Sequence, residues 1–209
     1  MAERRAALLV VDVQNDFVPG GALPVPEGDR VVPVLNEYIR RFREAGLPVY
    51  FSRDWHPERT RHFKEFGGAW PPHCVQGTSG AEFHPELEVP TDAVVITKGA
   101  DPEEDAYSAF QGRTTEGESF AERLRRDGVT HLYVGGLATD YCVRASALDA
   151  LAAGLKVTVL VDAVRGVDVQ PGDSERALAE LRDRGAETAT LETLQLGEPT
   201  SPPAPRPGS

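Results

Sequence analysis

The sequence predicts an α/β fold, a three-layer, doubly wound and mostly parallel sheet with helices on both faces. Short, continuous apolar runs, such as residues 6–13, are typical of strands that are buried on both faces. Segments with helical spacing of apolar residues lie between these runs, as at Val32, Leu35, Ile39 and Phe42. Strands that alternate with helices in this way favour a parallel sheet.

The individual elements follow from the same patterns. Strands are expected at residues 6–13, 47–52, 93–98, 131–134 and 155–161, with a last edge strand at 188–191. Helices are expected at residues 29–46, 119–126, 140–153 and 171–185. The long segment 53–90 has little periodicity and holds four of the five histidines. A loop of this length in a compact domain usually has a function.

The composition bounds the class of protein. The 209 residues suit one domain, residues 1–196, followed by a proline-rich tail, residues 197–209, that we expect to be disordered. The formal net charge of −11 argues against nucleic acid or an anionic membrane as the main partner. No apolar run approaches the roughly 18 residues of a membrane span, and no signal-peptide pattern is present. We therefore expect a cytoplasmic protein whose cysteines, Cys74 and Cys142, are reduced.

Cys142 lies in the segment around which the chain is organised. The apolar run 131–134 ends in two glycines, and a segment suited to a helix follows from Asp140. This pattern predicts a strand, a tight turn and a helix start, with the cysteine in the first helical turn. The N–H groups and dipole of a helix start would stabilise a nucleophilic thiolate and hold an oxyanion beside it. Taken alone, the residue fits a small buried side chain equally well.

Other chemically useful groups are expected at the same edge of the sheet. Asp12 ends the first predicted strand, Asp54 follows the second and Lys98 ends the third. Ligands of such sheets bind outside the carboxyl ends of the strands. Beside Cys142, Asp12 suits a general base that takes the thiol proton and returns it to a leaving amine, while Lys98 keeps it ionised. Singly, a strand-end carboxylate that caps a turn and a surface lysine are both common.

A metal site is indicated in the irregular segment. Asp54 and His56 are two residues apart, so in extended chain they point to the same side. His62 and His73 follow downstream, and an aspartate with two histidines suits one divalent transition metal, zinc, iron or manganese. Scattered loop histidines are also common, and we interpret His84 as such a residue.

Three aromatic residues are expected in loops at this edge, namely Phe17, Trp70 and Tyr107. Such side chains can close off a hydrophobic core. They can also form an apolar slot for a flat ring.

The order of the motifs resembles that of the nicotinamidase/pyrazinamidase family, within the isochorismatase-like cysteine hydrolases. The resemblance runs from residue 7 to about residue 192. It rests on residues 11–17 (VDVQNDF), 54–57 (DWHP), 70–74 (WPPHC), 98–99 (KG), 107–110 (YSAF) and 136–143 (GLATDYCV). The second and third of these segments are the more specific, because they mark the metal-dependent nicotinamidases.

The resemblance implies a role for each matching position. Asp12, Lys98 and Cys142 match the catalytic triad, and the amides of Ala138 and Cys142 match the oxyanion hole. The remaining matches are the metal ligands Asp54, His56 and His73, a further ligand of some members at His62, the substrate slot of Phe17, Trp70 and Tyr107, and a cis peptide bond between Leu137 and Ala138.

The function implied is a metal-dependent hydrolysis of nicotinamide, and of pyrazinamide, to the acid and ammonia in NAD salvage. The expected intermediate is a thioester on Cys142, and the expected partner is the small-molecule substrate, with no nucleic acid or membrane and with a homodimer left open. The chain departs from the family pattern in a very acidic stretch, residues 101–105, which follows Lys98 and affects the expected substrate preference.

Three other functions fit parts of the pattern. The nearest is an amidase of the same superfamily that acts on another small carboxamide or a ureide. A non-haem iron oxygenase also uses two histidines and one carboxylate, but it needs oxygen and ferrous iron and no cysteine. A non-enzymatic metal-binding protein would leave Asp12, Lys98 and Cys142 without a purpose.

Overall fold

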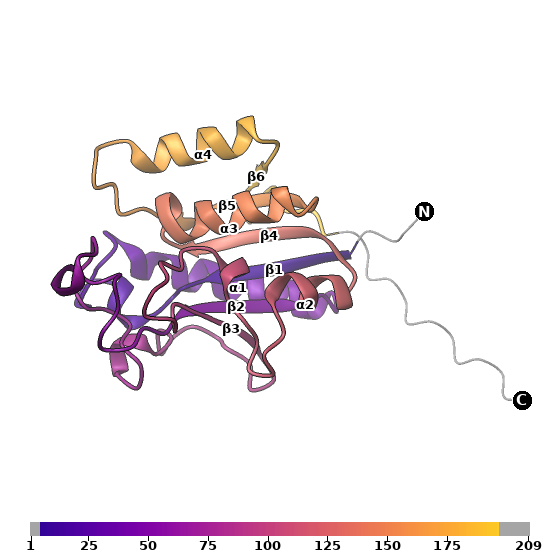
Figure 1. Ribbon diagram of the computed structural model, residues 1–209. Coiled ribbons are helices and arrows are strands. Elements are labelled where there is room, and N and C mark those ends of the chain that lie inside the picture. The colour runs from indigo at the N-terminus through magenta and orange to yellow at the C-terminus, as the bar shows by residue number, and fades with distance from the viewer. Residues whose placement is uncertain (1–4, 197–209) are drawn as a thin grey trace, which may run out of the picture.

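One parallel sheet forms the centre of the protein in a computed structural model that describes residues 5–196 (Figure 1). The six strands lie in the order β3-β2-β1-β4-β5-β6, and every neighbouring pair is parallel. They are β1 (Arg5–Val11), β2 (Val49–Asp54), β3 (Val94–Lys98), β4 (Val129–Leu137), β5 (Lys156–Arg165) and β6 (Glu187–Ala189). The predicted fold class and the edge strand are confirmed.

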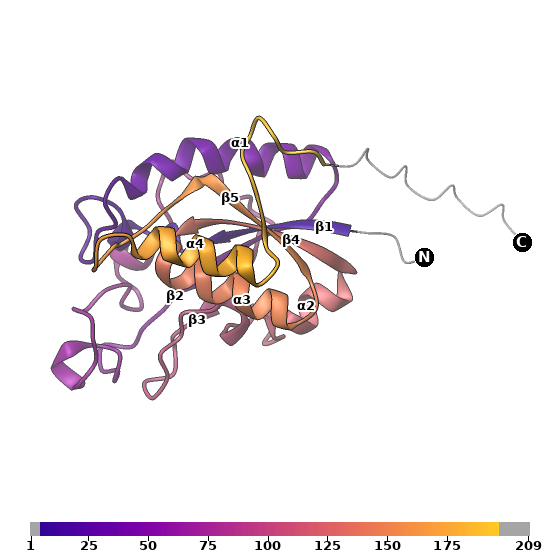
Figure 2. The same cartoon turned by 90° about the horizontal axis from the view of Figure 1, so that it is seen from above.

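Helices cover both faces of the sheet, which confirms the predicted three layers. They are α1 (Val31–Glu44), α2 (Phe120–Arg126), α3 (Arg144–Ala152) and α4 (Asp173–Asp183). Seen from above, α1 lies on one side of the sheet, whereas α2, α3 and α4 lie on the other (Figure 2).

The central strand β1 shows why this part of the sequence is a continuous apolar run. Leu8 and Val10 pack into the core cluster beneath α1, and Leu9 and Val11 pack into the opposite cluster beneath α2 and α3. Because both faces of the strand are covered, successive side chains are all buried and no polar residue can alternate with them.

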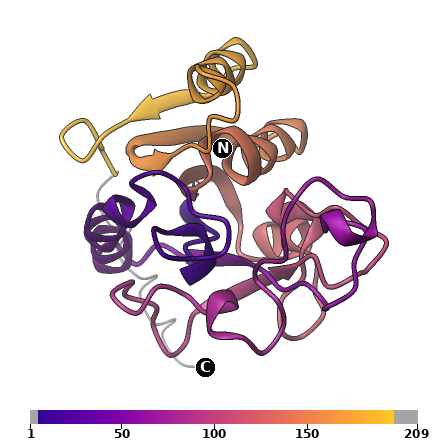
Figure 3. The same cartoon turned by 90° about the vertical axis from the view of Figure 1, so that its left-hand side faces the viewer.

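The functional edge of the sheet follows from its strand order. The chain adds β2 and β3 on one side of β1 and then crosses to add β4, β5 and β6 on the other. The carboxyl ends of β1 and β4 therefore meet at the point where the order reverses, which is where such sheets bind ligands. The loops gather at this edge, on the left of Figure 1 and toward the viewer in Figure 3.

The end of β4 differs from its prediction. The sequence predicted a strand that stops before Gly135 and Gly136, but β4 continues through both glycines to Leu137. A Cβ atom on Gly136 would lie 2.2 Å from the Val11 carbonyl oxygen. The glycine therefore marks a close approach of two strand backbones, and not a turn.

The helix after β4 also begins differently. A π-helical turn, Thr139–Val143, precedes α3, which begins only at Arg144. Cys142 lies in this π turn and not in the first turn of an α-helix. Single π turns inside or beside α-helices are frequent at functional sites.

The remaining boundaries differ by a few residues. β2 ends at Asp54 and β5 continues to Arg165, both later than predicted, while the long segment between β2 and β3 contains only short 3₁₀ turns and isolated bridges. Within residues 5–196, no helix has the length and apolar character needed to cross a bilayer. The predicted proline-rich tail, residues 197–209, lies outside the described residues.

Candidate active site

Asp12, Lys98 and Cys142, the predicted triad, meet at the carboxyl ends of β1, β3 and β4. Asp12 is fully buried, and Lys98 and Cys142 are 1% and 7% exposed. Lys98 Nζ lies 2.8 Å from Asp12 Oδ2 and 3.5 Å from Cys142 Sγ. A carboxylate oxygen of Asp12 and the sulfur of Cys142 lie within 4.8 Å of each other. A carboxylate, an ammonium and a thiol thus share one buried space.

Asp12 is held by the backbone as well as by side chains. Its φ of 47° is left-handed, a conformation that aspartate tolerates better than most residues. Its N–H donates to the Ser52 carbonyl at 3.1 Å, and Ser52 Oγ donates to Asp12 Oδ1 at 2.7 Å. With Lys98 on Oδ2, the carboxylate has fixed partners on both oxygens.

Burial and the neighbouring charges shift the pKa values of all three side chains. It raises the pKa of the Cys142 thiol well above its ordinary value, with Lys98 opposing the shift. It also raises the pKa of Asp12, again against Lys98. Burial alone would lower the pKa of Lys98, but Asp12 and Asp54 hold it well above its ordinary value. The sequence predicted a thiolate stabilised by a helix start, whereas burial at this site favours the protonated thiol.

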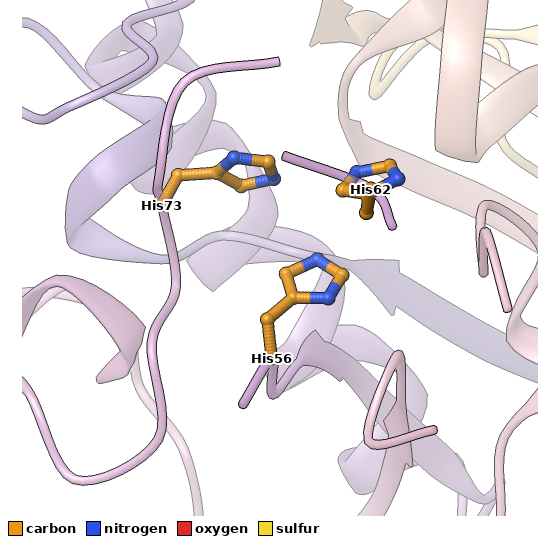
Figure 4. Close-up of side chains that lie close together, drawn as sticks. All are labelled: His56, His62 and His73. Carbon is orange, nitrogen blue, oxygen red and sulfur yellow. The ribbon is translucent and has the colours of Figure 1, made fainter. Parts of the chain in front are cut away.

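The three histidines predicted as metal ligands converge in the neighbouring space (Figure 4). His56 Nδ1 donates to the Gly99 carbonyl at 3.0 Å, and His73 Nδ1 donates to the Pro71 carbonyl at 2.7 Å. A carbonyl oxygen can only accept, so each of these rings carries its proton on Nδ1 and a lone pair on Nε2. The anchors thus fix the tautomer that a metal ligand needs.

The arrangement fits a metal ion. His56 Nε2 is fully buried and makes no hydrogen bond among the described residues. It lies 3.5 Å from Asp54 Oδ2, which is also 3.9 Å from His73 Nε2. Ligand atoms of His56, His62 and His73 lie within 4.8 Å of one another. Burial lowers the pKa of His73 to about 4, so its imidazole is neutral at neutral pH, the form that binds metal.

Lys98 connects the two groups. Its ammonium also forms a short contact with Asp54 Oδ1, so Asp54 presents one oxygen to the lysine and the other to the histidines. Burial alone would raise the pKa of Asp54, but Lys98, followed by His56, holds it below its ordinary value. Asp54 therefore stays ionised beside Asp12, a carboxyl group whose pKa is raised.

A pocket of about 400 Å³, including its open mouth, leads to these residues. Phe17, Trp70 and Tyr107, the predicted aromatic slot, all line it together with Cys142 and Ala138. The Trp70 indole donates to the Tyr107 hydroxyl at 2.9 Å, which fixes the two rings against each other.

The slot suits a flat, apolar ring, because its walls are mostly aromatic and aliphatic while its polar groups are few and convergent.

Residues 101–105, all of them described, do not line the pocket. The bond between Leu137 and Ala138 is cis, as the resemblance implies.

Residues 6–193 match the isochorismatase domain. The chain belongs to the isochorismatase family. It is 44% identical over 202 residues to the nicotinamidase of Escherichia coli K12, covering 88% of this chain and 94% of that one. The zinc complex of Pyrococcus horikoshii pyrazinamidase superposes with a TM-score of 0.82 at 52% identity, over 90% of this chain and 99% of that one. PnC1 from L. infantum in complex with nicotinate superposes with a TM-score of 0.81 at 35% sequence identity. The match covers 91% of this chain and 95% of that one.

Several residues of this isochorismatase site were missed from the sequence. Ser52 holds Asp12, and its signal was a lone polar residue near the carboxyl end of a buried strand. Gln14 holds Asp54, since its amide accepts from Asp54 N and donates to Asp54 O, both at 2.8 Å. Tyr141 lines the pocket 5.0 Å from the Trp70 ring, and its position directly before the cysteine was the only signal.

Proposed function

We propose that the protein is a metal-dependent nicotinamidase of the cytoplasm that hydrolyses nicotinamide, and pyrazinamide, to the acid and ammonia in NAD salvage, acting as a single domain. One observation carries the proposal: Cys142, two of the three clustered histidines (His62 and His73) and the aromatic slot all line the same pocket. The names of the similar proteins agree with it, because they include a nicotinamidase and a pyrazinamidase bound to zinc.

Asp54, His56, His62 and His73 would hold one divalent transition metal, zinc, iron or manganese. When bound there, the metal would supply a Lewis acid for the ring nitrogen of the substrate, and so would serve mainly to position it. Phe17, Trp70 and Tyr107 would enclose the ring and exclude water from its faces.

The first half of the reaction forms the thioester. Asp12 takes the proton of the Cys142 thiol as the sulfur attacks the amide carbon. The oxyanion accepts hydrogen bonds from the amides of Ala138 and Cys142, and losing one such donor typically costs about 3–4 kcal/mol in the barrier. Asp12 then gives its proton to the amine, and ammonia leaves. A carboxyl whose pKa is raised by burial suits both steps, because it can hold the proton between them.

The second half regenerates the enzyme. Asp12 takes a proton from water as the water oxygen attacks the thioester carbon, and the sulfur leaves with the proton returned to it. Lys98 Nζ, 2.8 Å from Asp12 Oδ2, limits the cost of the Asp12 charge in a buried site.

The alternatives find less support. An amidase for another small carboxamide or a ureide was favoured by the acidic stretch 101–105, but none of those residues lines the pocket. An oxygenase has no use for the thiol beside Asp12. A non-enzymatic metal-binding protein has no use for the buried triad or for the aromatic slot.

The test is ammonia release from nicotinamide, pyrazinamide and a ureide by native protein, by chelated protein and by chelated protein given back zinc, iron or manganese. We expect release from nicotinamide that is lost with the chelator and restored by at least one ion. Release from the ureide alone would favour the alternative amidase. Release from nicotinamide that a chelator does not change would contradict the metal-dependent mechanism.

A further inference from the structure

The segment after β3 touches both halves of the proposed site. At its start, the Gly99 carbonyl accepts from His56 Nδ1 at 3.0 Å. Near its end, the Ala106 carbonyl accepts from Lys98 Nζ at 3.1 Å. The acidic stretch 101–105 therefore lies between two anchors, one on the proposed metal ligand His56 and one on the proposed catalytic residue Lys98.

Asp105, the last residue of that stretch, makes a third contact of this kind. Its Oδ1 lies 2.5 Å from Nδ1 of His62, a ring that is 3% exposed. The backbone beside this pair is also fixed, because Arg61 N and Thr60 Oγ1 both donate to the Pro102 carbonyl, at 2.9 Å and 3.2 Å. The carboxylate and the imidazole are thus held together from both sides.

The chemistry of the anchor separates His62 from the other two histidines. His56 and His73 donate Nδ1 to neutral carbonyls, whereas His62 donates to a carboxylate. A carboxylate on the far nitrogen fixes the tautomer and makes the near nitrogen a stronger donor to a metal. Metal-ligating histidines commonly donate their other ring N–H to a carboxylate, so this anchor is the one expected if His62 binds the metal directly.

We propose that Asp105 is a positioning residue that holds His62, through Nδ1, as a direct ligand of the metal. The proposal rests on the metal site of the proposed function. It assigns the acidic stretch a role in metal binding and not in substrate selection, and it gives that stretch a single functional carboxylate among four acidic residues.

The test measures metal affinity without turnover. Zn²⁺ is titrated against a chromophoric chelator, and Co²⁺ is titrated by its visible absorption, whose intensity reports coordination. Asp105→Ala is expected to weaken binding about 10–100-fold, and Asp105→Asn, which keeps an acceptor, by less. The matched control is Glu103→Gln, which removes one charge from the same stretch at an exposed side chain with no hydrogen bond among the described residues. It should stay within about twofold of wild type. Circular dichroism of the metal-free variants checks their fold, and Asp105→Asn replaces the alanine variant if that one unfolds.

A double-mutant cycle tests the route of the effect. In a His62→Ala background, Asp105→Ala should cause no further loss, because the residue acts through that ring. A further tenfold loss there, or an affinity for Asp105→Ala equal to that of Glu103→Gln, would overturn the proposal. So would a His62→Ala variant that binds both metals as wild type does.

Ammonia release by wild type separates the two proposals. Metal-dependent release together with an unchanged affinity in Asp105→Ala removes only the role of Asp105. Loss of affinity in Asp105→Ala together with no ammonia release by wild type removes the proposed reaction and leaves the positioning role standing. A wild-type protein that binds neither metal overturns both.

Discussion

Two aspartates at opposite ends of the sheet have nearly the same partners and opposite properties. Asp12, at the carboxyl end, accepts from Ser52 Oγ at 2.7 Å and from Lys98 at 2.8 Å. Asp127, at the amino end, accepts from the Tyr50 hydroxyl at 2.6 Å and from Arg123 at 2.7 Å. Each carboxylate therefore has one hydroxyl, contributed by β2, and one cation.

The difference lies in what surrounds each pair. Asp12 is fully buried beside Asp54, and burial raises its pKa despite Lys98. Burial would raise the pKa of Asp127 too, but Arg123 and Tyr50 outweigh it and the pKa is lowered. The first carboxylate can hold a proton during a reaction, whereas the second is ionised at neutral pH and serves as a charged partner. Hydrogen-bond partners alone thus do not make a base; desolvation and a second carboxylate do.

The largest expected effect concerns Cys142. Its thiol lies beside Asp12, whereas Asp127 has no thiol beside it. Cys142→Ala should lower kcat/KM for nicotinamide by at least about 10⁴-fold, because no other group can form the thioester. Metal content should be unchanged, since the sulfur is not among the proposed ligands. Ammonia assays and metal analysis check both points. Turnover close to that of wild type would show that the mechanism is wrong.

The next effect compares the aspartates directly. Asp12→Asn should lower kcat by roughly 10²–10⁴-fold, because the proton carrier is lost while the left-handed backbone is tolerated by asparagine. Asp127→Asn should leave kcat within about twofold of wild type. Steady-state kinetics of the two variants measure the contrast, and equal losses would mean that Asp12 has only a structural role.

The next prediction concerns the free energy of unfolding, which a change beside Asp127 should lower without affecting kcat. Tyr50→Phe removes the hydroxyl that donates to Asp127 and should cost about 1–2 kcal/mol, since the carboxylate loses a partner in a partly buried place. The kcat of this variant should not change. Urea unfolding of the metal-free protein measures the loss, and a stability equal to that of wild type would indicate that water replaces the hydroxyl.

The smallest effects concern pH. The pKa of Asp127 is lowered, so its contribution to stability is present above the ordinary aspartate value of 3.8 and is lost as pH falls through the lower value. The pKa of Asp12 is raised, so its contribution has the opposite sign: it is present below 3.8 and is lost as pH rises through the higher value. Relative to wild type, unfolding should therefore depend less steeply on pH in Asp127→Asn below pH 3.8, and more steeply in Asp12→Asn above pH 3.8. Slopes that change in the same direction in both variants would contradict the assignment.

The pH dependence of kcat/KM should also reflect the raised pKa of Asp12. The ionised carboxylate of Asp12 is the active form, so kcat/KM should fall at acid pH with a midpoint above 3.8. A midpoint at or below 3.8 would indicate that Asp12 is not the base, or that it is solvated during turnover.

The sequence predicted the groups that occupy strand ends better than it predicted the chain between them. Asp12, Asp54 and Lys98 could be placed at one edge because apolar runs fix the strands and a parallel sheet fixes their direction. Gly136 was misinterpreted as a turn, since a glycine that turns the chain and a glycine that lets two backbones approach look alike in a sequence.

Contacts across loops could not be predicted at all. Gln14 reaches Asp54 and Asp105 reaches His62 over separations of 40 and 43 residues. No local pattern encodes such pairs, because they depend on how irregular segments fold against each other. The acidic stretch 101–105 contributes no residue to the pocket lining, although Asp105 contacts His62, which does line it.

The most direct test of the account is to trap the thioester with hydroxylamine during nicotinamide turnover. Hydroxylamine is about as small as the ammonia that leaves, so it can reach the same carbon. The account predicts that wild type converts part of its product to the hydroxamate in proportion to hydroxylamine concentration, and that Cys142→Ala forms none. Continued ammonia release with nicotinic acid as the only product at every hydroxylamine concentration would contradict a covalent intermediate on Cys142.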